Sequence, residues 1–175
     1  MTPADLLADA FGRIPDTVDG VLAGIDEDVL VRLPDPEGNS IAWLVWHLIR
    51  VQDDHVSEVA GREQAWTADG WADRFALPLA DAATATGYGH GPAEVAAVRP
   101  GADLLRGYLA AVNERTQQFL RTLTPEDLDR VVDVRWDPPV TLGVRLVSVV
   151  DDDAQHAGQA ALLRGVLERG RPAQS

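Results

Sequence analysis

The residues with the clearest chemical potential are Asp152 and His156, which interrupt an apolar stretch from Leu142 to Leu167. If this stretch is one helix, the two side chains share a face, with Cβ atoms about 6 Å apart. A carboxylate and an imidazole so placed can bind one metal ion together. The same pair would be a simple ion pair if it faced water. Asp153, three residues before His156, could also replace Asp152 as the carboxylate.

A third ligand has to come from another helix, and His47 is the best candidate among the four histidines. His47 and His55 lie eight residues apart, about 12 Å along a helix. Two nitrogens bound to one ion lie at most about 4.2 Å apart, so these two cannot share it. His90 lies in a glycine-rich segment, where it could approach a pocket or face water.

We therefore expect His47, Asp152 and His156 to form a three-ligand site with open positions for water or substrate, as in catalytic metal centres. The alternative is that His47 is an ordinary hydrogen-bonded core histidine. Polar residues that could orient the imidazoles lie nearby in the sequence: Gln52, Asp54 and Gln159.

The first element that must position this site is an N-terminal helix. Thr2 can cap it and Pro3 suits its first position. Apolar residues from Leu7 to Ile25 recur at steps of three and four, which indicates one stripe of a bundle helix. Because the stripe keeps its phase across Pro15, we expect a kink there and not an end.

A second helix is expected from a cap at Asn39 or Ser40 to Gly61. Residues 41–49 are apolar apart from His47, which predicts a helix that is buried on most sides.

A long connection follows, over residues 62–100, with short helices expected at 66–77 and 92–98. Such a connection usually crosses a bundle or covers a site. A third helix is expected at 102–123, and residues 131–136 read as extended.

The last long segment gives a divided signal. Residues 140–150 alternate with period two, as in a strand, whereas the apolar run of more than 20 residues without a turn favours a helix capped by Thr141. Four long helices and one long crossover between the second and third predict an all-α four-helix bundle. A length of 175 residues suits a single domain, 1–175.

Composition excludes several classes of function. The chain has no Cys, which excludes disulfides, zinc–thiolate sites and a cysteine nucleophile, and fits a reducing cytoplasm. All 15 basic residues are Arg, so Schiff-base chemistry and a P-loop are excluded. A net charge of −13 argues against a nucleic-acid partner. We see no signal peptide and no apolar run of about 20 residues that would span a membrane.

Four segments together resemble a known family. They are NSIAWLVWHL at 39–48, TGYGH at 86–90, RWDPPVTLGVRLVS at 135–148 and DDAQHAGQ at 152–159. They resemble the DinB/YfiT-like superfamily of metalloenzymes, and most closely its actinobacterial mycothiol-transferase branch, which is related to the mycothiol-dependent maleylpyruvate isomerases.

The resemblance implies a four-helix bundle around a metal held by a histidine of the second helix and a His-x-x-x-His pair of the fourth. His47 then takes the first position and His156 the last. Asp152 stands where the family has histidine, although the related isomerases also carry a carboxylate there. Two histidines and one carboxylate suit Zn²⁺, Ni²⁺ or Fe²⁺. The resemblance also implies that residues 142–167 are helical.

The chemistry that the resemblance implies is transfer of a thiol, mycothiol, activated at the metal and aimed at an electrophile. Arg50 and Arg145 lie near the metal-bearing segments and could bind carboxylates of the thiol or substrate. A homodimer is also expected. The alternatives are a non-catalytic metal-binding or stress-response module, and a hydrolase that uses a metal-bound water.

Overall fold

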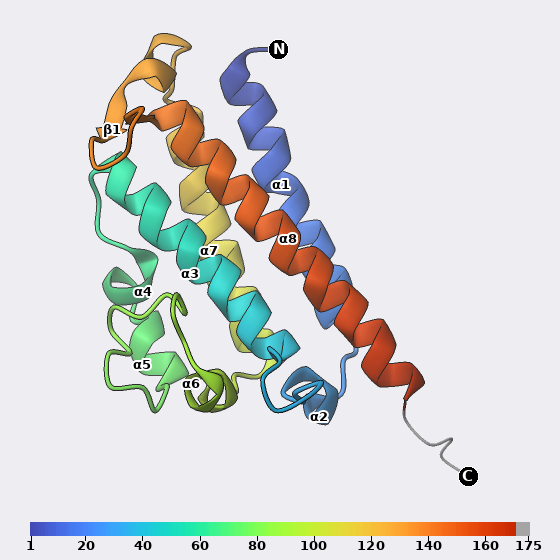
Figure 1. Cartoon of the computed structure of the whole chain (residues 1–175). Helices are drawn as coiled ribbons and strands as arrows, with labels where there is room; N and C mark the ends of the chain where they lie inside the picture. The colour runs from blue at the N-terminus through green and yellow to red at the C-terminus, as the bar shows by residue number, and fades with distance from the viewer. Residues whose placement is uncertain (171–175) are drawn as a thin grey trace.

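Four long helices packed side by side dominate the computed structural model, which describes residues 1–170 (Figure 1). They are α1 (Pro3–Leu22), α3 (Ile41–Ala60), α7 (Ala102–Leu120) and α8 (Leu142–Arg169). The expected four-helix bundle with a long crossover between its second and third long helices is confirmed. The end of the expected domain, 171–175, lies outside the described residues.

Helix α1 begins as expected, with a capping box between Thr2 and Asp5, and it continues through Pro15. It ends at Leu22, earlier than the apolar pattern suggests. The pattern runs on to Ile25 because this residue packs against the core from the following turn. A short helix, α2 (Glu27–Leu30), comes next.

Helix α3 is the central helix of the site. The Ser40 hydroxyl accepts a hydrogen bond from the Trp43 backbone N–H at its start, and Gly61, with φ of 65°, ends it. Residues 41–50 are all buried, as the uninterrupted apolar pattern predicts, because the helix packs against both α7 and α8.

The crossover lies beside α3 on the side away from α1 (Figure 1) and contains α4 (Ala65–Ala68), α5 (Trp71–Phe75) and α6 (Pro92–Ala97). The single short helix expected at 66–77 is wrong. Two helices form instead because Gly70 between them adopts a φ of 70°, which interrupts the helical conformation.

A 3₁₀ turn (Glu126–Asp129) and a small antiparallel hairpin of β1 (Val131–Asp133) and β2 (Val140–Thr141) precede α8. The strand alternative for residues 142–150 is wrong. The buried residues of α8 recur mainly at steps of three and four, and the β-branched Val144 of the period-two pattern is exposed. Within residues 1–170, no helix combines the length and apolarity of a membrane span.

Candidate metal centre

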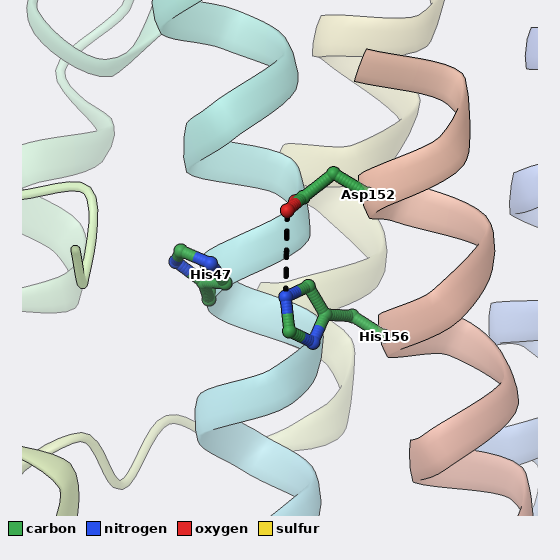
Figure 2. A group of neighbouring side chains, drawn as sticks. All are labelled: His47, Asp152 and His156. Atoms are coloured by element: carbon green, nitrogen blue, oxygen red, sulfur yellow. Dashed lines mark ion pairs between the residues drawn. The ribbon is translucent and has the colours of Figure 1, made fainter. Parts of the chain in front are cut away.

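The antiparallel packing of α3 and α8 brings together three side chains that are far apart in the sequence (Figures 1 and 2). His47, Asp152 and His156 each offer a ligand atom, and these atoms all lie within 4.8 Å of one another. The imidazole centroids of His47 and His156 are 4.8 Å apart with planes at 77°. Asp152 Oδ1 lies 3.6 Å from His156 Nε2.

The hydrogen bonds of the two histidines leave the same nitrogen of each ring available. His47 Nδ1 donates to the backbone carbonyl of Thr86, which can only accept. His156 Nδ1 lies 3.0 Å from Gln159 Oε1, which accepts its proton. Each ring therefore keeps its Nε2 lone pair for a cation, and its orientation is fixed by the other nitrogen.

These residues fit a divalent cation. Asp152 Oδ2 is buried and has no hydrogen-bond partner within the described chain, so it has an unused acceptor site. Ligand atoms around a shared ion lie up to about 4.2 Å apart, so small side-chain rotations would close the set around an ion. Two imidazoles and a carboxylate suit Zn²⁺, Ni²⁺ or Fe²⁺.

The charge states of His47 and Asp152 also favour a cation. Burial lowers the pKa of His47. Burial opposes ionisation of Asp152, but hydrogen bonding and charge from His156 outweigh it and lower the pKa of this carboxyl. The same hydrogen bond raises the pKa of His156. At neutral pH the group thus combines a neutral His47 with an ionised Asp152.

Of the two candidate carboxylates, the one that lies with the histidines is Asp152. Asp153 is fully buried, and neither of its oxygens has a hydrogen-bond partner among residues 1–170. Burial, with a smaller contribution from the Asp152 charge, raises the pKa of Asp153 well above its usual value.

Trp43 belongs to the buried core and also covers one side of the site, a role that the sequence analysis did not predict. Its ring stacks on His47 with centroids 4.7 Å apart and meets His156 edge-on at 6.4 Å. Its Nε1 donates to His90 Nδ1 at 3.2 Å, and the His90 ring stacks on Trp46. His90 therefore lies against both tryptophan rings.

The crossover also reaches the site through Gly87, which has a φ of 96°. A Cβ atom at this position would lie 2.7 Å from His47 Nδ1 and 3.1 Å from atoms of Trp43 and Trp46. Glycine is thus required both by the backbone conformation and by the close approach to the histidine.

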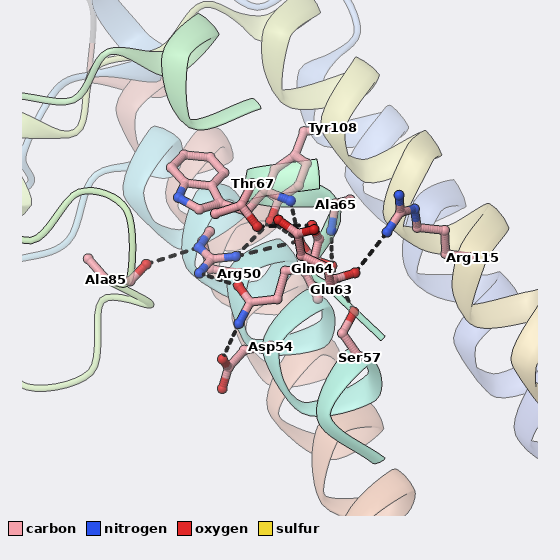
Figure 3. A network of polar contacts seen from close by, with 12 residues as sticks. Arg50, Asp54, Ser57, Glu63, Gln64, Ala65, Thr67, Ala85, Tyr108 and Arg115 are labelled. Carbon is pink, nitrogen blue, oxygen red and sulfur yellow. Dashed lines mark hydrogen bonds and ion pairs between the residues drawn. The ribbon is translucent and has the colours of Figure 1, made fainter. Parts of the chain in front are cut away.

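Arg50 lies in a buried polar network and not at a ligand site (Figure 3). Its guanidinium donates to the Ala85 carbonyl at 2.9 Å, the Tyr108 hydroxyl at 3.0 Å and Gln64 Oε1 at 2.8 Å. Asp53 accepts from Tyr108 at 2.7 Å. Because the side chain is fully buried by protein groups, the expectation that Arg50 binds a carboxylate of a ligand has no geometric support.

The other residues predicted from the sequence differ in whether they contact the metal group. Arg145 lies 2.8 Å from Glu58 and 3.2 Å from Asp133 and lines a cleft that none of the three candidate ligands lines. Among the three residues expected to orient the imidazoles, Gln159 contacts His156, whereas the other two bond elsewhere. Gln52 donates to Thr116, and Asp54 accepts from Gln64.

Comparison with known proteins identifies the family. Residues 6–169 match the family described as mycothiol-S-transferase. The chain belongs to the mycothiol-S-transferase family. The DinB/YfiT-like fold expected from the sequence is confirmed. The structure is similar to a crystal structure of a conserved protein from Enterococcus faecalis, at 33% sequence identity and a TM-score of 0.89, over 97% of this chain and 99% of that chain. A search of curated proteins finds no match.

Proposed function

We propose that the chain is a metal-dependent thiol S-transferase that uses mycothiol and acts through a divalent ion held by His47, Asp152 and His156. The observation that carries this proposal is the convergence of three donors from two helices, with both imidazole Nδ1 atoms already engaged. Membership in the mycothiol-S-transferase family supports the choice of thiol.

The chain's own residues perform three tasks in this proposal. The two imidazoles and the carboxylate hold the ion, while the Thr86 carbonyl and Gln159 keep the imidazole Nε2 atoms directed at it. Trp43 covers one side of the group and limits the access of water. When bound, a divalent cation lowers the pKa of a coordinated thiol from its free value near 8.5 and so supplies thiolate at neutral pH.

The nucleophile has to come from a cosubstrate, since the chain contains no Cys. A thiolate is a far better nucleophile than a thiol. The group leaves coordination positions beyond its three protein ligands, which is the arrangement that a thiol cosubstrate requires.

The experiment that tests this function is incubation of the zinc-loaded protein with mycothiol and a mixture of electrophiles, followed by mass spectrometry of the products. We expect thioether conjugates with the wild-type protein and with Asp151→Ala, a control that removes an exposed carboxylate on the same helix as His156 but outside the metal group and the neighbouring cleft. We expect none above background with His156→Ala. Equal conjugate formation by His156→Ala would contradict the proposal.

Two alternatives appear as other outcomes of the same experiment. Stoichiometric metal without thiol consumption across the panel would favour a non-catalytic binding module. Hydrolysis of an electrophile without thiol incorporation would favour a metal-bound water as nucleophile. Assembly into a homodimer remains a prediction, which sedimentation equilibrium would test.

A further inference from the structure

A cleft of about 560 Å³, lined mostly by charged and polar residues, lies between α3, the crossover, and the hairpin with the start of α8. It lies about two helical turns further along the bundle than the metal group. From His47 to Asp54 and His55, which line the cleft, the rise along α3 is about 10–12 Å.

The cleft and the metal group are built on the same segments. Thr84 lines the cleft, and the backbone carbonyl of Thr86, two residues later, accepts the hydrogen bond from His47. On α8, Arg145 lines the cleft seven residues before Asp152, a rise of about 10 Å. A single extended ligand could therefore reach from one to the other.

The charges that line the cleft are balanced. Three arginines and three carboxylates face it: Arg62, Arg135, Arg145, Asp54, Glu58 and Glu63. On a chain with a net charge of −13 this balance is a local departure from the acidic average. The cleft therefore selects neither a strong anion nor a strong cation.

Several lining groups have hydrogen-bonding capacity left over. Arg62 Nε is buried without a hydrogen-bond partner in the described part of the chain. The hydroxyls of Thr67 and Thr84 donate to backbone carbonyls at 3.4 and 3.3 Å, and their oxygens can still accept. The lining thus offers both a free donor and free acceptors. This suits ligand hydroxyl groups, each of which donates one hydrogen bond and accepts others.

We propose that this cleft binds the polyhydroxylated glycoside part of the thiol cosubstrate and thereby places its sulfur at the metal group. The inference rests on the proposed function. Mycothiol carries its N-acetylcysteine on a glucosamine–inositol unit, so that its thiol and its hydroxyl groups are at opposite ends of the molecule. The metal group would bind the thiol end and the cleft the hydroxyl-bearing end. The cleft volume is in the range of small-molecule sites.

The test compares two thiols that differ in the glycoside: mycothiol and N-acetylcysteine. The cleft variants are Arg62→Gln and Thr84→Val. The matched controls are Arg99→Gln, an exposed arginine outside the cleft, and Thr122→Val, whose hydroxyl also donates to a carbonyl three residues earlier. Each protein is loaded with zinc, and its metal content and melting temperature are measured first.

We expect Arg62→Gln to raise the KM for mycothiol by about tenfold, the effect of losing one charge-assisted hydrogen bond. Thr84→Val should raise it several-fold, and both variants should leave the KM for N-acetylcysteine and the zinc content unchanged. The controls should match the wild type with both thiols. Unchanged KM values for mycothiol, or equal changes with both thiols, would overturn the assignment of the cleft.

If the wild-type protein consumes no thiol, the proposed function fails. A second measurement then tests separately whether the cleft binds a glycoside. Saturation-transfer NMR with the thiol-free glucosamine–inositol compound should then show binding to the wild type and Arg99→Gln. Loss of the signal in Arg62→Gln supports the cleft as a glycoside site. No signal with the wild type, or an equal signal in Arg62→Gln, rejects it.

Discussion

Substitution of Gly87 by alanine should disturb the metal group although it replaces none of the three ligands. The added Cβ would lie 2.7 Å from His47 Nδ1, well inside van der Waals contact, and 3.1 Å from two tryptophan rings. Those rings are buried and cannot move away easily. The His47 imidazole therefore has to move, and this weakens its hydrogen bond to the Thr86 carbonyl.

Gly89 provides a matched control in the same segment. Its φ is 78°, close to the 96° of Gly87, but a Cβ there meets nothing within 4 Å. Both alanine variants should lose about 1–2 kcal/mol of unfolding free energy to the left-handed backbone conformation. Only Gly87→Ala should lose a further ~1 kcal/mol for the His47 hydrogen bond and about 10–100-fold in zinc affinity, the usual cost of losing a ligand's orienting partner.

Zinc affinity is measured by competition with a chromophoric chelator, and stability by urea unfolding of the metal-free protein. The difference between the two variants isolates the contact with His47 from the backbone strain. Equal zinc affinities for Gly87→Ala, Gly89→Ala and the wild type would refute the reasoning, because they would show that the orientation of His47 does not depend on the crossover.

Three further predictions concern ionisable groups. Because burial raises the pKa of Asp153, the unfolded chain releases a proton above pH 3.8 that the folded chain retains, so this residue lowers stability as pH rises. Asp153→Asn should therefore stabilise the metal-free protein at pH 7 by about 1–3 kcal/mol, and urea unfolding should show the gain shrinking towards pH 4. Arg50→Met leaves the buried Asp53 carboxylate without its cationic neighbour and should cost about 3–5 kcal/mol, measured as a lower urea midpoint; an unchanged midpoint would contradict the network. The hydrogen bond to Asp152 raises the pKa of His156 above 6.5, which stabilises the metal-free fold at low pH and is lost as pH rises through that pKa. Since zinc must displace this proton, zinc affinity should begin to fall as pH drops through a value above 6.5, and in Asp152→Asn that midpoint should move down.

The sequence was sufficient for the features that depend on spacing and local chemistry. The four-residue step from Asp152 to His156, and the single histidine in the apolar segment around His47, predicted which side chains meet. The caps Thr2, Ser40 and Thr141 fixed where three of the long helices begin. Helix ends and short elements were less well predicted, because the conformations of glycines such as Gly70 decide them and these depend on tertiary packing.

The parts that the sequence could not supply are contacts between segments with no local signature. Backbone carbonyls such as that of Thr86 carry no residue identity, so its bond to His47 is invisible in the sequence. Arg50 and Arg145 look alike by their proximity to the metal-bearing segments. The structure buries Arg50 among protein acceptors and places Arg145 at a cleft, a difference that only the packing of the crossover determines.

The most direct test of the metal centre is the metal content of protein purified without added metal, measured by inductively coupled plasma mass spectrometry. We expect about one divalent ion per wild-type chain and per His55→Ala chain, since the structure brings together a single three-ligand group in its described residues. We expect His47→Ala and His156→Ala to lose most of that metal. Equal metal content in all four proteins would contradict a centre built from His47, Asp152 and His156.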